Sequence, residues 1–338
     1  MNTISNVKFN QGIYLFPLDW MIDNETFRET VYAELEAHPN IKGMKLRVYP
    51  NRLEPEEGVY DFSLIDSVLT RLTAMGKQLF LIYMYKSWGS EYPLPAYLNT
   101  PLNENGAYQF SQNGGTNPVG YHSKLWVPEV VAGINKQVNE IGRIYNKHPN
   151  FEGIVFPETA ANPPISGFTM TEELWTGYYN GVLSVAQNAM VALPNCSNIQ
   201  FVNYPKDVLT WLVPALVEAG MGVGGPDTFR DEIGLIANPV DNPFTLPGAY
   251  YYYPPLKNVV PLGPSIQKKN FISTTNDGTG PKPTVEEIYS FARDNLKGDY
   301  VFITRQPEYV QDIYPFVDSI QADNGGLLGS NPSSFILR

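Results

Sequence analysis

The chain has 338 residues, 43% of them hydrophobic, and its 23 Lys and Arg against 34 Asp and Glu give a formal net charge of −11. This acidic balance argues against a nucleic-acid partner, which requires a basic surface, and against binding to an anionic membrane. No run of 18 apolar residues is present, so no transmembrane helix is predicted.

Cysteine and histidine are too scarce to indicate a bound metal. The single cysteine, Cys196, excludes an internal disulfide and a cysteine-based metal cluster, and the three histidines have no ligand-like spacing. We therefore predict neither a metal nor another cofactor. The N-terminal stretch 1–11 is polar and lacks the apolar core of a signal peptide, which favours a cytoplasmic protein or one released by a non-standard route.

Short apolar runs alternate with amphipathic stretches along the whole chain. The predicted strands are 12–16, 41–48, 77–85, 151–159, 199–202, 221–227, 259–267 and 300–303. The predicted helices are 24–37, 62–75, 128–147, 171–192, 206–219, 284–296 and 309–321, with Asn24 as the cap of the first. A long insertion, 86–127, follows the third strand, and an irregular stretch, 228–258, follows the sixth.

Eight strand–helix units in a chain of this length predict an α/β fold, a (β/α)8 TIM barrel with enlarged strand-end loops. The alternative is a doubly wound open sheet, which has a glycine-rich phosphate turn after its first strand. Here the first strand runs into Phe16-Pro-Leu-Asp-Trp20, which contains no glycine. No change of composition marks a second domain, so one barrel domain over residues 1–338 is expected, and nothing in the sequence indicates an oligomeric state.

Residues at the strand ends are the candidates for chemistry, because barrel enzymes place their active sites there. They are Arg47, Tyr85, Glu158, Asn203, Asp227, Gln267 and Arg305, and each of them has an alternative role as a simple strand cap. Glu158 follows a buried apolar run and Pro157, and these neighbours favour its protonated form. Hydrolysis of a glycosidic bond needs such a proton donor together with a second carboxyl group.

The sequence is rich in aromatic rings, with 22 Tyr, 17 Phe and 5 Trp. Aromatic faces stack on the apolar faces of sugars, which favours a carbohydrate partner, although a large core would also explain the rings. The rings in strand-end loops are Trp20, Tyr85, Trp88, Trp126 and Tyr204. We favour Trp88 and Trp126 because they flank the long insertion, and loops of that length are usually functional.

A distinctive turn follows the second predicted strand. Leu46-Arg47 precedes Glu54-Pro-Glu-Glu-Gly-Val-Tyr-Asp-Phe62, and Met75-Gly-Lys-Gln-Leu79 and His148-Pro149 precede the third and fourth strands. Together these segments resemble the first half of glycoside hydrolases of clan A, whose turn reads Glu-Pro-x-x-Gly-x-Tyr-Asp-Phe. The resemblance implies a barrel that acts on a glycan. It also implies that Glu158 is the acid/base and that Arg47 supports the second carboxylate.

Two positions depart from that family. Pro157 stands where the family usually has asparagine before the acid/base glutamate. The family's nucleophile is a glutamate that ends strand seven, whereas the predicted strand here ends Pro264-Ser-Ile-Gln267. No carboxylate lies between Asp241 and Asp277, so the nucleophile is missing from its usual place or the strand lies elsewhere.

Asp227 is our first candidate for the second carboxylate, because the preceding Gly224 and Gly225 allow the backbone to approach a ligand closely. Glu308 and Asp19 are the other candidates. A separation well above about 6 Å from the first carboxyl group would predict an inverting mechanism.

The sequence therefore predicts a glycoside hydrolase of a polysaccharide or oligosaccharide with Glu158 as proton donor. The residues predicted to bind substrate are Arg47, Tyr85, Trp88, Trp126, Asn203, Tyr204, Gln267 and Arg305. The alternative is a barrel that binds glycan without cleaving it. A metal-dependent barrel enzyme is disfavoured by the scarcity of histidine.

Overall fold

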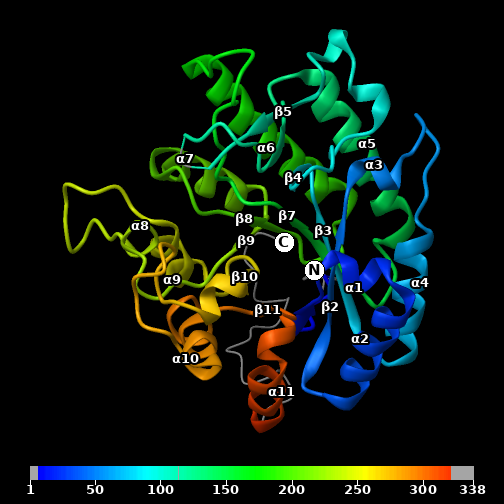
Figure 1. Ribbon diagram of the computed structural model, residues 1–338, viewed down its shortest axis with the longest axis vertical. Coiled ribbons are helices and arrows are strands. Elements are labelled where there is room, and N and C mark those ends of the chain that lie inside the picture. The colour runs from blue at the N-terminus through cyan, green and yellow to red at the C-terminus, as the bar shows by residue number, and fades with distance from the viewer. Residues whose placement is uncertain (1–6, 113, 321–338) are drawn as a thin grey trace, which may run out of the picture.

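The computed structural model describes residues 7–112 and 114–320, and it shows a closed barrel of parallel strands (Figure 1). In order around the barrel the strands are β1 (Gly12–Phe16), β11 (Tyr300–Thr304), β10 (Leu262–Ile266), β9 (Gly222–Gly225), β8 (Ile199–Phe201), β7 (Phe151–Phe156), β3 (Gln78–Tyr83) and β2 (Ile41–Val48). The first and last strands close the ring in parallel, from Gly12 opposite Tyr300 to Phe16 opposite Thr304. The predicted (β/α)8 barrel is confirmed.

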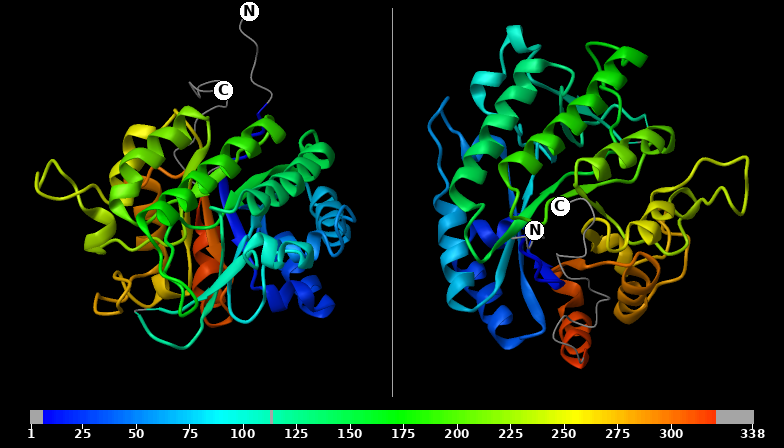
Figure 2. Two further views of the ribbon diagram at one scale, coloured as in Figure 1. Left: turned by 90° about the horizontal axis from the view of Figure 1, so that it is seen from above. Right: turned by 180° about the vertical axis from the view of Figure 1, so that it is seen from behind.

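Helices alternate with the strands and surround the barrel (Figure 2). The longer helices are α2 (Glu25–Ala37), α4 (Ser63–Ala74), α5 (Pro128–Tyr145), α6 (Glu172–Ala192), α7 (Lys206–Glu218) and α11 (Val310–Ser319). The short ones are α1 (Asp19–Asp23), α3 (Pro50–Leu53), α8 (Ile233–Ile236), α9 (Tyr253–Leu256) and α10 (Val285–Ser290), with the tighter turns η1 (Ala96–Leu98), η2 (Pro101–Asn103), η3 (Ala249–Tyr252), η4 (Lys268–Phe271) and η6 (Pro307–Tyr309). Asn24 caps α2 as predicted, because its side chain accepts from the N–H of Phe27 at 3.2 Å.

Two hydrophobic cores result from the alternation of side chains along the strands. Ile13 and Leu15 of β1 belong to the outer core between the barrel and its helices. Tyr14 and Phe16 belong to the inner core, which is filled mainly by rings such as Phe80. Side chains therefore fill most of the barrel interior below the loops that follow the carboxyl ends of the strands.

The turn between β2 and α4 is built around a buried carboxylate. Glu54 is fully buried and accepts from the backbone N–H of Gly58 at 2.8 Å, from Gln137 Nε2 at 2.8 Å and from the Tyr97 hydroxyl at 3.0 Å. Gly58 has a φ of 77°, a conformation that glycine adopts without strain. The glutamate thus ties the turn to α5 and to the insertion after β3.

That insertion forms a small antiparallel sheet. Its strands β4 (Lys86–Trp88), β6 (Gly120–Ser123) and β5 (Ala107–Phe110) pair in that order. An isolated bridge from Phe110 to Pro164 joins the sheet to the loop after β7. The insertion therefore lies over the same end of the barrel as Glu158.

One loop projects from the body of the molecule after α8 (Figures 1 and 2). It is closed at its base by the N–H of Gly248, which donates to the carbonyl of Ala237 at 2.8 Å. Apolar side chains are exposed along it, with Val240 79% and Phe244 98% accessible to solvent. The stretch 228–258 is thus a mixture of short helices and this loop.

Several boundaries differ from the predicted ones. The third strand ends at Tyr83, and Lys86 begins β4 in the other sheet, because the chain leaves the barrel between them. The helix predicted over 284–296 changes from α10 to a π-helical turn, η5 (Phe291–Asn295). The closing helix ends at Ser319, and Gln321, like residues 1–6 of the polar N-terminus, lies outside the described residues. No helix within 7–112 or 114–320 is long and apolar enough to cross a membrane.

Candidate active site

A cleft of about 450 Å³ lies at the carboxyl ends of the barrel strands. The predicted site residues that line it are Arg47, Trp88, Glu158, Asn203, Tyr204, Asp227 and Gln267. They come from β2, from the insertion and from the loops after β7, β8, β9 and β10. Side chains that were predicted from their places at strand ends, and that are up to 220 positions apart in the sequence, from Arg47 to Gln267, thus line one cleft.

Glu158 lies in the cleft directly after Pro157, two residues beyond the end of β7. Its Oε2 accepts from Asn203 Nδ2 at 2.5 Å. Burial raises the pKa of the Glu158 carboxyl above its ordinary value, while the Lys86 ammonium and the bond from Asn203 act in the opposite direction. The carboxyl group therefore keeps its proton to a higher pH than an exposed glutamate does.

Two neighbours hold the backbone and the side chain of Glu158 in place. Lys86 on β4 donates to the carbonyl of Glu158 and, at 2.7 Å, to that of Ala160. The Asn203 side-chain oxygen accepts from the N–H of Ala160 at 2.9 Å and from that of Tyr204 at 2.8 Å. Because its oxygen is fixed by two N–H groups, the amide must present its nitrogen to Glu158.

Asp227 follows β9 and Pro226, and it faces the same cleft. Burial raises the pKa of its carboxyl to about 7, the negative charge of Glu158 adds to this rise, and Lys269 partly opposes it. The backbone carbonyl of Asp227 accepts from the Tyr250 hydroxyl at 3.1 Å, which fixes the loop. The two carboxyl groups are thus close enough for the charge of Glu158 to raise the pKa of Asp227.

The glycines before Asp227 serve strand packing. A Cβ on Gly224 would lie 2.4 Å from the carbonyl oxygen of Gly263 on β10, and one on Gly225 would lie 2.9 Å from the Tyr253 hydroxyl. We expected glycines at these positions because they let the backbone approach a ligand. In the structure, the backbone instead approaches neighbouring protein atoms closely.

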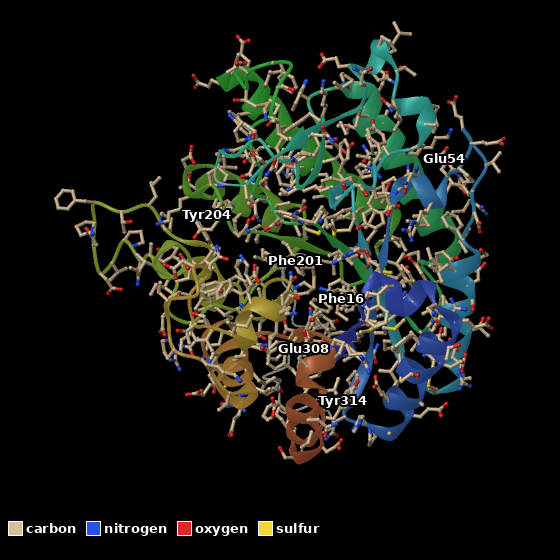
Figure 3. The ribbon with its side chains drawn as sticks, viewed as in Figure 1. Phe16, Glu54, Phe201, Tyr204, Glu308 and Tyr314 are labelled. Carbon is tan, nitrogen blue, oxygen red and sulfur yellow. The ribbon has the colours of Figure 1, made fainter. Side chains whose placement is uncertain are left out.

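The other two candidate carboxylates lie outside the residues that line the cleft. Asp19 accepts from Arg47 Nη1 at 3.0 Å, and Arg47 lies over the ring of Phe16. Glu308 is exposed and pairs with Lys268 at 2.6 Å. Figure 3 shows Phe16 near the centre of the barrel, with Glu308 on the segment that leads into α11.

Gln267 follows β10 at the place where the family resemblance implies a glutamate. Its Nε2 donates to the carbonyl of Pro226 at 2.8 Å, and its backbone N–H donates to Asn270 Oδ1 at 2.7 Å. The amide therefore connects the loop after β10 to the loop that carries Asp227.

Three predicted substrate-binding residues are used elsewhere in the structure. Tyr85 is buried and stacks on Phe156 with the ring centroids 6.3 Å apart. Trp126 donates from Nε1 to Glu104 at 3.1 Å. Arg305 turns toward α2 and donates to both carboxylate oxygens of Glu34, at 2.6 and 2.5 Å. None of the three lines the cleft.

The sequence analysis missed His122 and Asn162, which both line the cleft. His122 stacks on Phe110 at 4.0 Å, and its Nε2 accepts from the N–H of Asn162 at 3.2 Å. Burial lowers the pKa of His122 well below its ordinary value, so the ring is neutral. Only its position in the long insertion signals a role. Within the described part of the chain, no three His, Cys, Asp or Glu side chains gather as a metal-binding group.

No family model matches the chain, and no curated protein sequence matches it. Among solved structures, the β-galactosidase of the haloarchaeon Halorubrum lacusprofundi matches with a TM-score of 0.56 at 12% identity, over 86% of this chain and 52% of that one. The catalytic domain of β-amylase from Paenibacillus polymyxa matches with a TM-score of 0.55 at 9% identity, over 98% and 99%. GH5_18 from Streptomyces cattleya, in complex with GlcNAc, matches with a TM-score of 0.51 at 10% identity, over 88% and 70%.

The chain spans about half the length of the β-galactosidases that it matches. Identities of 9–12% to these three proteins show a common architecture. The chain therefore shares its closed parallel barrel with a group of glycoside hydrolases.

Proposed function

We propose that the protein is a glycoside hydrolase that cleaves glycosidic bonds in a polysaccharide or oligosaccharide, with Glu158 as proton donor and Asp227 as the second carboxyl group. One observation carries the proposal: two carboxyl groups from the ends of β7 and β9 face one cleft, and the negative charge of Glu158 contributes to the raised pKa of Asp227. Glycosidases need such a pair, with one member protonated and the other ionised. The shared fold of the structural neighbours supports it.

In this mechanism Glu158 gives its proton to the oxygen of the leaving sugar. Asp227 then acts on the other side of the bond, either by activating a water molecule or by attacking the anomeric carbon. Asn203 fixes the Glu158 carboxyl group and stabilises its anion once the proton has left, since its amide nitrogen donates to Oε2. Trp88 and Tyr204, which line the cleft, would bind the sugar rings.

A specific observation favours the reverse assignment of the two roles. Burial raises the pKa of both carboxyl groups, but Lys86 and Asn203 oppose the rise at Glu158, whereas the charge of Glu158 adds to the rise at Asp227, whose pKa reaches about 7. Surroundings that act differently on two carboxyl groups can divide the work of acid and base between them. The experiment must therefore identify which carboxyl group donates the proton.

Substrates with poor and good leaving groups make that distinction. With Glu158→Gln, we expect kcat/KM on an unactivated oligosaccharide to fall by about 10²- to 10⁴-fold, and much less on a nitrophenyl glycoside, which needs no proton. Asp227→Asn should impair both substrates alike. If Asp227→Asn shows the dependence on leaving group instead, the roles are reversed. Unchanged turnover of the oligosaccharide by the Glu158 variant would refute its role as proton donor.

The second candidate function is glycan binding without cleavage. Gln267 favours it, because an amide occupies the position after β10 where the resemblance implies a nucleophile. A panel of glycans tested for both binding and newly formed reducing ends separates the two functions. Binding with no reducing ends formed supports the second, whereas reducing ends that disappear with Glu158→Gln support hydrolysis.

A further inference from the structure

Lys45 occupies an unusual position inside the barrel. It lies on β2, is fully buried, and donates one hydrogen bond to the described part of the chain, to Ser265 Oγ at 3.3 Å. Its Nζ lies 4.2 Å from the ring centre of Phe16, 4.4 Å from that of Phe302 and 4.9 Å from that of Phe201. Among the described residues, no carboxylate is within ion-pair distance of this nitrogen. A buried amine with so few polar partners is costly unless it has a function.

The surroundings of Lys45 connect it to the cleft. A cavity of about 60 Å³ lies beside its side chain, and this volume holds more than one water molecule. The residues shared by this cavity and the main cleft are Arg47, Trp88, Glu158, Pro226 and Gln267. Figure 3 shows Phe16 and Phe201, which also line the cavity, near the barrel centre. The cavity is thus the floor of the cleft, with the amine and Glu158 both at its wall.

Two other buried lysines show what a structural lysine looks like in this protein. Lys86 donates to the carbonyls of Glu158 and Ala160, and Lys77, at the opposite end of the barrel, donates to the carbonyl of Ile41. Both therefore satisfy backbone acceptors. Within the described ranges Lys45 donates to no carbonyl, and its hydroxyl partner at 3.3 Å is long for a hydrogen bond to an ammonium group.

The same surroundings favour a neutral amine. Burial lowers the pKa of Lys45 well below its ordinary value, and the positive charge of Arg47 lowers it further. A desolvated lysine next to another cationic group is the usual form of an activated amine nucleophile. A larger fraction of this amine therefore carries a free electron pair than is the case for an exposed lysine.

We propose that Lys45 is a nucleophile that captures the carbonyl group of an open-chain sugar as an imine, an activity separate from glycoside hydrolysis. The amide and carboxyl groups of the cleft suit the hydroxyls of such a ligand, while its carbonyl end reaches the apolar cavity. Nζ attacks the carbonyl carbon, a C–N bond forms, and the carbonyl oxygen takes up the proton that the nitrogen loses. The resulting hydroxyl then leaves as water with a proton from Glu158, the nitrogen returns its remaining proton to the Glu158 carboxylate, and C=N remains. Amine and carbonyl thus give imine and water, and hydrolysis reverses the step.

Reductive trapping tests the proposal on the full chain. The protein is incubated at neutral pH with glyceraldehyde and cyanoborohydride, which reduces only the imine, and modified lysines are mapped by peptide mass spectrometry. We expect Lys45 to be labelled at least about tenfold faster than the buried controls Lys86 and Lys77. In Lys45→Met this fast label disappears, while the slow labelling of exposed lysines is unchanged.

Two further measurements keep the result interpretable. A thermal melt shows that Lys45→Met is folded, and Lys45→Arg, which keeps a cation but forms no imine, must also lack the label. Absence of label on Lys45, or labelling at the rate of Lys86, overturns the proposal. Trapping involves no glycosidic bond, so its failure leaves the proposed hydrolase function untouched, and a failure of hydrolysis leaves trapping untouched.

Discussion

The two carboxyl groups in the cleft, those of Glu158 and Asp227, have different neighbouring side chains. Glu158 is held by Asn203 and lies near Lys86, whereas no protein donor is seen on the Asp227 side chain within the described residues. Burial is the larger cause of the raised pKa of Asp227, the negative charge of Glu158 adds to it, and no hydrogen bond from the described residues to the side chain offsets the two effects. A neutral side chain at this position removes both effects.

Asp227→Asn should therefore stabilise the protein at neutral and alkaline pH. The ordinary pKa of the aspartate is 3.8 and its folded value is about 7, so between these values the folded chain holds a proton that the unfolded chain has lost. Stability of the wild type falls as pH rises through this window, by at most about 4 kcal/mol. Melting curves of the two proteins should coincide near pH 3 and separate by about pH 8, with the variant higher.

Glu308→Gln is a control for which the expected change of stability with pH has the opposite sign. In the wild type the hydrogen bond with Lys268 lowers the pKa of the exposed Glu308, so the wild type gains stability as the pH rises past the ordinary pKa of a glutamate. The variant should lose a little stability at neutral pH and none in acid. If the melting temperatures of Asp227→Asn and the wild type differed by the same amount at all pH values, the raised pKa assigned to Asp227 would be contradicted.

Lys86→Met should move the pH dependence of catalysis. The Lys86 ammonium lowers the pKa of Glu158, so its removal raises that pKa and keeps the carboxyl protonated to higher pH. With Glu158 as proton donor, the alkaline limb of kcat/KM should shift upward by about one pH unit. Lys77→Met, a buried lysine at the other end of the barrel, is the matched control and should leave the limb in place.

The place of a single side chain could be predicted where the local sequence determines which way that side chain points. Glu158 follows an apolar strand and a proline, so its place at the strand end is readable from the sequence. Arg305 also follows a strand, but Glu34 on α2 attracts its side chain, and that partner is distant in sequence. Lys45 was missed because a single lysine in an apolar strand normally marks a solvent-facing position, whereas here the inward face is filled by rings.

Among the elements, the turn after β2 has the clearest energetic role. Glu54 satisfies three donors from three different segments while fully buried, so the carboxylate is effectively a structural cross-link. The resemblance to glycoside hydrolases rests on this turn, and packing alone explains why the glutamate and the glycine occur together there.

Glu54→Gln should destabilise the fold by about 2–4 kcal/mol, because the new amide nitrogen would face donors and leave one of them unsatisfied. Denaturant unfolding measures the loss. Glu56→Gln, two positions along the same turn and exposed, is the matched control and should change stability by less than about 0.5 kcal/mol. Equal effects of the two substitutions would show that the buried network contributes little.

Element prediction failed mainly in the insertion. Its strands have three or four residues each, and β4 and β6 are as polar as a loop. Their pairing depends on each other and on β5, not on an apolar period that a sequence reveals. The glycine-rich strand predicted over 221–227 is weakly apolar, and the structure has β9 there.

For the whole molecule, the alternation of strands and helices was enough to predict the barrel and the end at which its cleft lies. What the sequence did not reveal was which strand-end side chains turn inward, since that depends on strand register around a closed ring. The predicted site residues therefore include side chains that line the cleft and others, such as Arg305, that do not.

The projecting loop after α8 gives the chain a place where it can be cut. Phe244 is almost fully exposed, so chymotrypsin should cleave there first, while the bond from Gly248 to Ala237 holds the loop base. The two fragments should remain one particle in gel filtration and separate only on a denaturing gel. Fragments that dissociate without denaturant would contradict this expectation.

The two fragments should stay together because the barrel is closed. The second fragment supplies β10 and β11, which pair with β9 and β1 of the first, so both edges of the gap are bonded to a strand from the other piece. The protein therefore consists of two fragments that complete one barrel and are joined by the projecting loop. The two fragments expressed separately should assemble on mixing, and foreign sequence inserted into the loop should leave the barrel intact.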